Sequence, residues 1–123
     1  MSDLDIESIS IQVGAQAGTV NRPLFRVPAS SSAFGGITIL NAYIYAGAAA
    51  TSQMQLQNLG TSLGTAVTSV IGTLNGTLVA NVQQAFSITT AYQATGTWIA
   101  LSTVSGDTLN ADSKVVIEYT WCK

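Results

Sequence analysis

Apolar and polar residues alternate over short stretches throughout this chain, and the alternation is clearest near its end. There, Val115, Ile117, Tyr119 and Trp121 occupy every second position, which predicts a strand with one buried face. Ile37–Ala46 carries apolar side chains at both odd and even positions, as expected of a central strand that is covered on both sides. No stretch has the spacing of an amphipathic helix. The pattern therefore predicts an all-β fold.

Further stretches with strand character lie between turns rich in Gly, Ser and Asn; they are residues 24–27, 53–57, 65–71, 82–90 and 98–104. Pro23 and Pro28 bracket the first of these stretches and predict a short or edge strand there. The dipeptide Asn75-Gly76 predicts a two-residue hairpin turn that pairs residues 72–74 with 77–79. About eight strands at this spacing predict a β-sandwich of jelly-roll-like arrangement, with an up-and-down barrel as the alternative. We expect the core to contain Ile39, Leu40, Ile44, Ile99, Leu101, Val115 and Ile117.

The 123 residues fit one domain. Residues 1–18 are interpreted as an N-terminal arm or first strand, and residues 19–123 as the β-sandwich domain. An arm can add a strand to a neighbour while its carboxylates meet basic groups, and Gly14–Gly18 predicts a hinge behind it. The candidate partner-binding residues are the acidic and apolar side chains Asp3, Asp5, Glu7, Ile9, Ile11 and Val13. The alternative is an ordinary first strand of the domain.

Charged residues occur only near the two ends of the chain, and residues 27–106 contain none. Soluble monomers usually intersperse charges over their surface, whereas interface cores are depleted in charge. The uncharged middle therefore favours a self-associating or assembled protein over a monomer covered by Ser, Thr and Gln. With a net charge of −2 and four basic residues, the chain lacks the basic surface that nucleic-acid binding requires.

Targeting signals are not evident. The acidic start, MSDLDIES, does not resemble a secretory signal peptide, which predicts synthesis in the cytoplasm. Residues 62–82 are uncharged but contain Gly64, Gly72 and Gly76 and lack flanking basic residues, so we do not expect a membrane span. Cys122 is the only cysteine, and an intrachain disulfide is therefore impossible.

Candidate catalytic and metal-binding residues are few, because the chain has no histidine and so lacks the commonest general base and metal ligand. Cys122 consequently has no imidazole partner to activate it. Asp107, Asn110 and Asp112 supply oxygen atoms for weak calcium binding, but a hydrogen-bonded turn explains them better. Glu118 is expected to point away from the apolar face of its strand. We therefore predict no enzymatic activity, no cofactor and no metal.

Aromatic residues offer one alternative, since aromatic rings can stack on the faces of sugars. A carbohydrate-binding platform would draw on Tyr43, Tyr45, Tyr92, Trp98, Tyr119 and Trp121. Aromatic side chains in β-sandwiches more often fill cores or subunit interfaces, which is the interpretation we prefer.

Several features of the chain from Ile37 onward occur together: an uncharged body rich in Thr, Gly and Ala, the strand Gly96-Thr97-Trp98-Ile99-Ala100-Leu101, a Gly-Asp-Thr-Leu-Asn-Ala turn at 106–111, and the aromatic last strand Val115–Trp121. In these features the chain resembles small β-sandwich structural proteins of tailed bacteriophages. The long N-terminal segment with its acidic tip departs from that pattern, and it is either the shell-binding arm or a sign of a tail component.

The resemblance implies a role in the virion. The expected protein is a capsid decoration or cement protein, a minor capsid protein that forms a homotrimer on the head surface. Its partners would be copies of itself and the major capsid protein of a phage. The alternative is a tail-associated or carbohydrate-binding module. The resemblance transfers no catalytic or ligand-binding residue to this chain.

Overall fold

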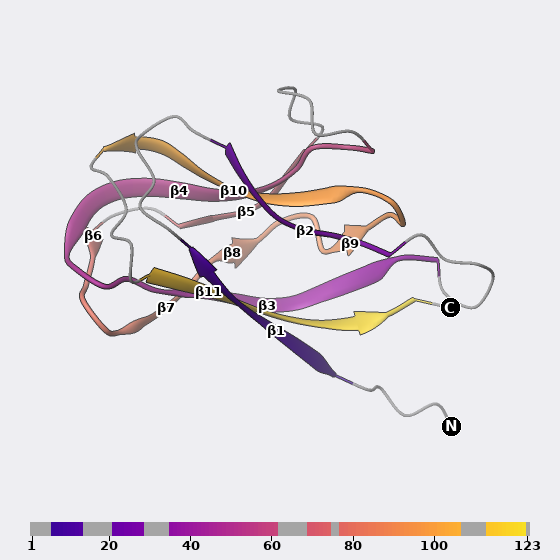
Figure 1. Ribbon diagram of the computed structural model, residues 1–123, viewed down its shortest axis with the longest axis horizontal. Helices are drawn as coiled ribbons and strands as arrows, with labels where there is room; N and C mark the ends of the chain where they lie inside the picture. The colour runs from indigo at the N-terminus through magenta and orange to yellow at the C-terminus, as the bar shows by residue number, and fades with distance from the viewer. Residues whose placement is uncertain are drawn as a thin grey trace.

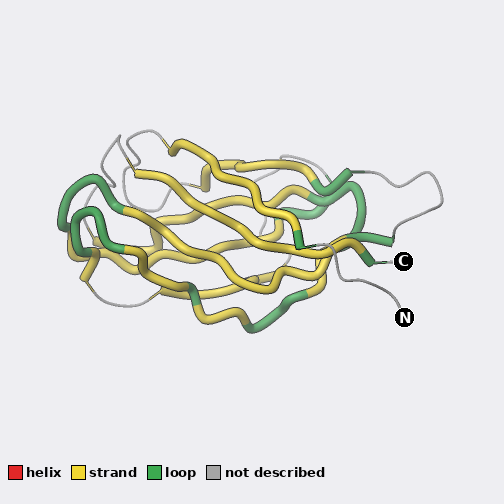
Figure 2. Tube along the Cα trace, turned by 90° about the horizontal axis from the view of Figure 1, so that it is seen from below, coloured by secondary structure: helices red, strands yellow, loops and turns green. Residues whose placement is uncertain are grey.

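The computed structural model describes residues 6–13, 21–28, 35–61, 69–74, 77–106 and 113–122. These residues form strands and no helix, and the strands make two antiparallel sheets that lie over one another (Figure 1). The strands run mostly along the long axis of the molecule (Figure 2). The predicted all-β sandwich is thus confirmed. No helix in the described ranges is long and apolar enough to cross a membrane.

Five strands form the first sheet: β1 (Glu7–Val13), β3 (Ile37–Tyr45), β7 (Gln83–Ala85), β9 (Tyr92–Gln93) and β11 (Ser113–Trp121). β3 lies inside this sheet, so its predicted central position is confirmed. The expectation that both of its faces are covered is wrong, because the outer face carries exposed or half-buried residues, Leu40, Asn41 and Tyr43 among them. β11 pairs with one side of β3 and separates it from β1, which lies at the edge. On the other side of β3, β7 pairs with the end of the strand and β9 with its beginning.

Six strands form the second sheet: β2 (Asn21–Arg26), β4 (Ala50–Asn58), β5 (Ser69–Leu74), β6 (Thr77–Leu78), β8 (Ser87–Ile88) and β10 (Trp98–Gly106). Their order is β2-β10-β4-β5-β8, with β6 also on β4. β2 is an edge strand, as the two prolines predict. The described residues contain eleven strands instead of the expected eight or so. The difference arises because β6 to β9 are only two or three residues long, too short to give a recognisable alternation.

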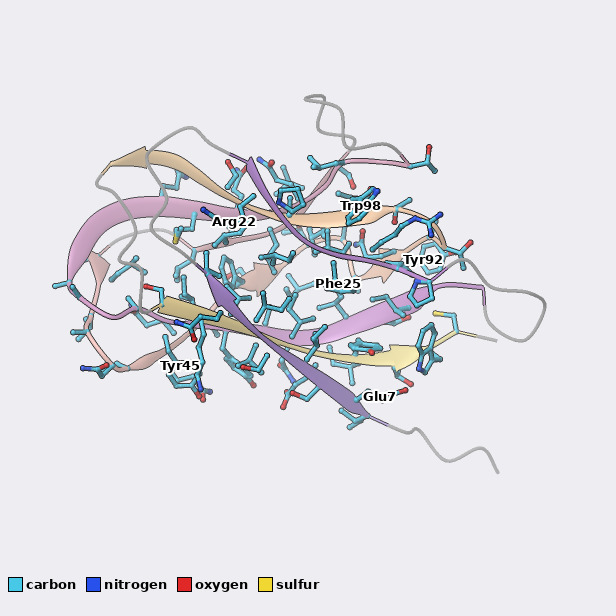
Figure 3. The ribbon with its side chains drawn as sticks, viewed as in Figure 1. Glu7, Arg22, Phe25, Tyr45, Tyr92 and Trp98 are labelled. Atoms are coloured by element: carbon cyan, nitrogen blue, oxygen red, sulfur yellow. The ribbon has the colours of Figure 1, made fainter. Side chains whose placement is uncertain are left out.

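The core lies between the sheets and contains fully buried side chains from both of them. Ile99 and Leu101 on β10, and Val115 and Ile117 on β11, have no exposed surface, which confirms the predicted phase of both strands. Phe25 extends from β2 into the space between the sheets (Figure 3) and packs against this core. Burial of apolar surface of this kind is the main favourable contribution to folding.

Leu40 is not in the core, and our prediction for it was wrong: its side chain is 37% exposed. Along β3 the register with β11 shifts at this residue, because Glu118 pairs with Asn41 and the next residue, Tyr119, pairs with Ile39. Leu40 is therefore the extra residue of a β-bulge. The bulge reverses the alternation, so that Ile39 faces inward before it and Ala42 faces inward after it.

The predicted hairpin at Asn75-Gly76 is also wrong. β5 pairs with the second half of β4, where Met54 lies opposite Leu74. β6 then pairs with the beginning of the same strand, where Ala50 lies opposite Leu78. The chain thus continues along β4 in one direction and does not reverse, because β4 is long enough to pair with both strands in turn. Residues 75 and 76 themselves lie outside the described residues.

Residues 83–93 close one side of the sandwich, because they contact both sheets. The backbone N–H of Phe86 donates to the carbonyl of Ala42 on β3, while Thr89 N–H donates to the carbonyl of Ile71 on β5. β8 comes so close to β5 that a Cβ atom on Gly72 would lie 2.8 Å from the carbonyl oxygen of Ser87. Glycine is therefore required at position 72, where β8 pairs with β5.

A buried group of polar side chains joins the sheets near β9. The Asn58 amide on β4 donates to Gln93 Oε1 at 2.7 Å and to Thr97 Oγ1 at 3.0 Å. Its carbonyl oxygen accepts from the backbone N–H of Gly60 at 2.7 Å. Gln93 and Thr97 in turn donate to backbone carbonyls. Since Asn58 and Gln93 belong to different sheets, these bonds tie the two layers together inside the protein.

Candidate interaction surfaces

The described residues do not assemble a recognisable catalytic or metal site. No three His, Cys, Asp or Glu side chains gather among them. The Cys122 thiol lies 3.0 Å from the hydroxyl of Thr38, and the Glu118 carboxylate accepts a 3.0 Å hydrogen bond from the amide of Asn41. Glu118 lies on the outer face of β11, as the sequence predicts. Asp107, Asn110 and Asp112 are outside the described residues.

The outer face of the first sheet presents a row of aromatic and polar side chains. Tyr45 on β3 hydrogen-bonds through its hydroxyl to Gln83 Oε1 on β7. On its other side, the ammonium group of Lys114 on β11 lies 5.3 Å from the centre of the Tyr45 ring, within the range of a cation–π interaction. Tyr43 lies between Val116 and Ala85 in the next row. The Tyr45 ring is thus held from both sides, by Gln83 on β7 and Lys114 on β11.

The six aromatic residues that sequence reasoning proposed as a carbohydrate platform do not gather on one surface. Tyr45 lies on the outer face of the first sheet, and Trp98 lies on the second sheet (Figure 3). Tyr119 and Trp121 are on the inward side of β11, where their rings make an edge-to-face contact with centroids 5.8 Å apart. The structure therefore offers no single aromatic platform within the described residues.

The apolar half of the predicted partner-binding segment forms strand β1. Ile9 lies opposite Ile117, Ile11 opposite Val115, and Val13 opposite Ser113 on β11. Because directly opposite residues project to the same face of a sheet, this row faces the core. Val13 is fully buried. This segment thus pairs within its own sheet as a first strand, which was the alternative to a free arm. Asp3, Asp5 and the predicted hinge at Gly14–Gly18 lie outside the described residues.

Glu7, the third carboxylate of that segment, lies at the beginning of β1 (Figure 3). Its carboxylate accepts a hydrogen bond from Trp121 Nε1. It also lies opposite Tyr119 in the register. Partial burial, and then the negative charge of Glu7, raise the pKa of the Tyr119 phenol above its ordinary value. This carboxylate thus stabilises the junction of β1 and β11 in the free protein.

The raised pKa of Tyr119 predicts a loss of stability at alkaline pH. A group whose pKa is higher in the folded than in the unfolded state makes its full contribution to stability at pH values below the unfolded pKa, which is about 10 for tyrosine. That contribution is lost as the pH rises through the folded pKa. Urea unfolding at a series of pH values between about 9 and 11.5 should show a smaller alkaline loss for Tyr119→Phe than for the parent protein. Identical pH profiles for the two proteins would contradict the assignment.

The turn between β6 and β7 exposes two apolar side chains, Val79 at 49% and Val82 at 46%. The amide of Gln84 braces this turn, because it accepts from the backbone N–H of Val79 and donates to the carbonyl of Thr77. Asn81 adopts a positive φ of 59° at the corner, and its N–H donates to the carbonyl of Ala46. The two valines are thus held outward by a hydrogen-bonded turn, a feature without a signal in the sequence pattern.

Charge is confined to three neighbouring strands among the described residues. Glu7 is on β1, Arg22 and Arg26 are on β2, and Lys114 and Glu118 are on β11. β1 and β2 lie at the same edge of the sandwich, in front in Figure 1, and β11 is next to β1. The strands from β3 to β10 carry no charged residue. The strands of the neutral middle that the structure describes therefore lie together, on the side of the sandwich away from β1 and β2.

No protein-family model matches the chain, and no curated protein matches it in sequence.

Proposed function

We propose that this protein is a structural component of a phage virion, a decoration or cement protein that binds the outside of the head shell and stabilises it. The observation that carries the proposal is the neutral side formed by β3 to β10. Charged side chains are depleted at the centres of protein interfaces, because burying an unpaired charge costs free energy. A sandwich with one side free of charge suits a protein whose surface is covered by other subunits.

The strand order adds support. The sheet with the strand order β1-β11-β3-β7 packs against the sheet with the order β2-β10-β4-β5. The segment that contains β7, β8 and β9 closes one side of the sandwich, and β6 pairs with β4 beyond the end of β5. We infer that this sandwich is of the jelly-roll type, an arrangement that occurs in viral capsid domains. A fold of this kind hosts many functions, so the topology supports the proposal only together with the neutral surface and the resemblance noted above.

In this proposal the neutral side contacts neighbouring copies and the major capsid protein, and the acidic tip at Asp3 and Asp5 meets basic groups on the shell. The braced turn with Val79 and Val82 adds apolar contacts. The protein adds buried area across subunit boundaries and so opposes the separation of capsid subunits under internal pressure. Carbohydrate binding on a tail is the other class, but no aromatic platform among the described residues favours it.

Copy number within the particle tests this function. Quantitative mass spectrometry of purified virions, from the phage whose genome encodes the chain, should find it in numbers comparable with the major capsid protein. A few copies per particle would place it in the tail and overturn the head assignment. Absence from virions that contain the other structural proteins would overturn the virion role altogether. Particles purified without the protein should also lose DNA at lower temperature than complete particles.

A further inference from the structure

The outer edge of β1 differs from the other strand edges of the sandwich. β1 pairs with β11 along all seven of its residues, without a bulge. β2 contains Pro23 and a register shift, and β7, β8 and β9 are two or three residues long. Prolines, bulges, lysines and short strands are the usual means by which proteins prevent pairing at an edge. Within the described residues β1 has none of them, and it pairs with β11 alone.

The core-facing side of β1 is incompletely covered. Ile9 and Ile11 are only partly buried, although the residues opposite them on β11, Ile117 and Val115, have no exposed surface. A further strand beside β1 would cover both isoleucines and remove more apolar area from water. The edge therefore gains from a partner strand in main-chain hydrogen bonds and in apolar burial.

We propose that this partner is β1 of a second copy, and that two molecules join edge to edge as an antiparallel, two-fold symmetric pair centred on Ser10. The two first sheets then become one continuous sheet across the dimer. In this register every residue of the strand has a partner: Ser10 with Ser10 of the second copy, Ile9 with Ile11, Ser8 with Gln12, and Glu7 with Val13.

The strand is self-complementary in this register. The isoleucines pair with each other on the core-facing side, and serines and glutamine pair on the outer side, so the alternation continues across the dyad. Glu7, the one charged residue in the strand, lies opposite a valine and not opposite its own copy. In the row beside it, Glu118 and Ser8 of one copy line up with Gln12 and Lys114 of the other, so no like charges face each other across the dyad. Centring the pair on Ile9 or Ile11 instead would leave two residues of each strand unpaired.

A two-fold pair is distinct from the trimer that the resemblance implies, and it does not depend on a role in the virion. The interface is isologous, so the contact closes on itself and does not propagate into a fibre. The two-fold pair also leaves the neutral side formed by β3 to β10 available for contacts with other subunits. The open edge is thereby covered in the assembled protein, which removes the risk of aggregation that an exposed strand carries.

Cysteine crosslinking tests the register. In a Cys122→Ser background, Ser10→Cys places the two sulphur-bearing residues directly opposite, with Cα atoms about 4.5–5.5 Å apart, within the range that a disulfide bridges. Mild oxidation should therefore give a covalent dimer. Ser8→Cys is the matched control, because it is equally exposed on the same face but lies four positions from its own copy, about 13 Å away. Crosslinking of Ser8→Cys but not Ser10→Cys would refute the register, and crosslinking of neither would refute the pairing.

A charge exchange tests the interface without oxidation. Ser10→Lys and Ser10→Glu each put like charges opposite one another at the dyad, so each protein alone should sediment as a monomer at micromolar concentration while the parent is a dimer. An equimolar mixture should restore the dimer through Lys–Glu pairs. Ala85→Lys, an exposed position on the opposite edge of the same sheet, should remain dimeric. A parent protein that is monomeric or trimeric, or Ser10 variants that remain dimeric, would overturn the proposal, and neither result bears on the copy number in virions.

Discussion

Asn58→Ala is expected to lower the free energy of unfolding by about 2–4 kcal/mol, a large effect for a single polar residue. The substitution removes two side-chain hydrogen bonds to Gln93 and Thr97 and one from the backbone N–H of Gly60. Gln93 and Thr97 are then left with polar groups that water reaches poorly, because both residues are buried. Denaturant unfolding should show the loss directly, and thermal unfolding should show a fall in Tm of about 10 °C.

The control for this prediction is Asn41→Ala on the outer face of β3. Asn41 also makes a side-chain hydrogen bond, to Glu118, but this bond is exposed to solvent. Its loss should cost less than about 1 kcal/mol, since water replaces the missing partner. Equal losses for the two variants would show that burial of the Asn58 cluster contributes nothing beyond the bonds themselves, and the cluster would not then be what joins the sheets.

Ile117→Ala is expected to destabilise the protein by about 2–5 kcal/mol, the usual cost of cutting a fully buried aliphatic side chain to Ala. Ile117 has no exposed surface, and it packs in the core with its cross-strand neighbour Ile9 beside it. The cavity that remains cannot close, because β11 is held between β1 and β3 over residues 114–119, on both sides of Ile117. The midpoint of urea unfolding should therefore fall markedly, with the slope of the transition unchanged.

The adjacent residue provides the matched comparison. Val116 is on the outer face of the same strand and is only partly buried, so Val116→Ala should cost less than about 1 kcal/mol. The difference in the free energy of unfolding between Ile117→Ala and Val116→Ala shows which face of β11 is turned toward the core. If Val116→Ala were the more damaging substitution, β11 would be turned with its other face toward the core, and the positions of Glu7, Tyr119 and Trp121 would be wrong as well.

The sequence alone determined the fold class and the phase of the regular strands. β11 alternates without interruption over its core-facing residues, so Val115 and Ile117 could be placed inward from the pattern. In β10 the small Ala100 separates Ile99 and Leu101, which could be placed inward as the two larger apolar side chains. Such placement succeeds because the side-chain period of a strand is two residues and burial selects one face. The same reasoning identified β2 as an edge strand through its prolines. The candidate arm residues Ile9, Ile11 and Val13 were correctly placed on one side of a strand.

Only the tertiary structure decided the features that depend on contacts between distant strands: bulges, strand pairing and the buried polar cluster. The bulge at Leu40 exists only because β3 and β11 differ by one residue over their paired length, and no local pattern reports the length of a distant strand. Likewise, Asn75-Gly76 favours a hairpin locally, but pairing of β4 with both β5 and β6 carries the chain onward. The Asn58 cluster joins residues 35 and 39 positions apart, and such a contact has no period in the sequence. Local chemistry sets the direction of each side chain, whereas partners and register arise only when the two sheets close over a shared core.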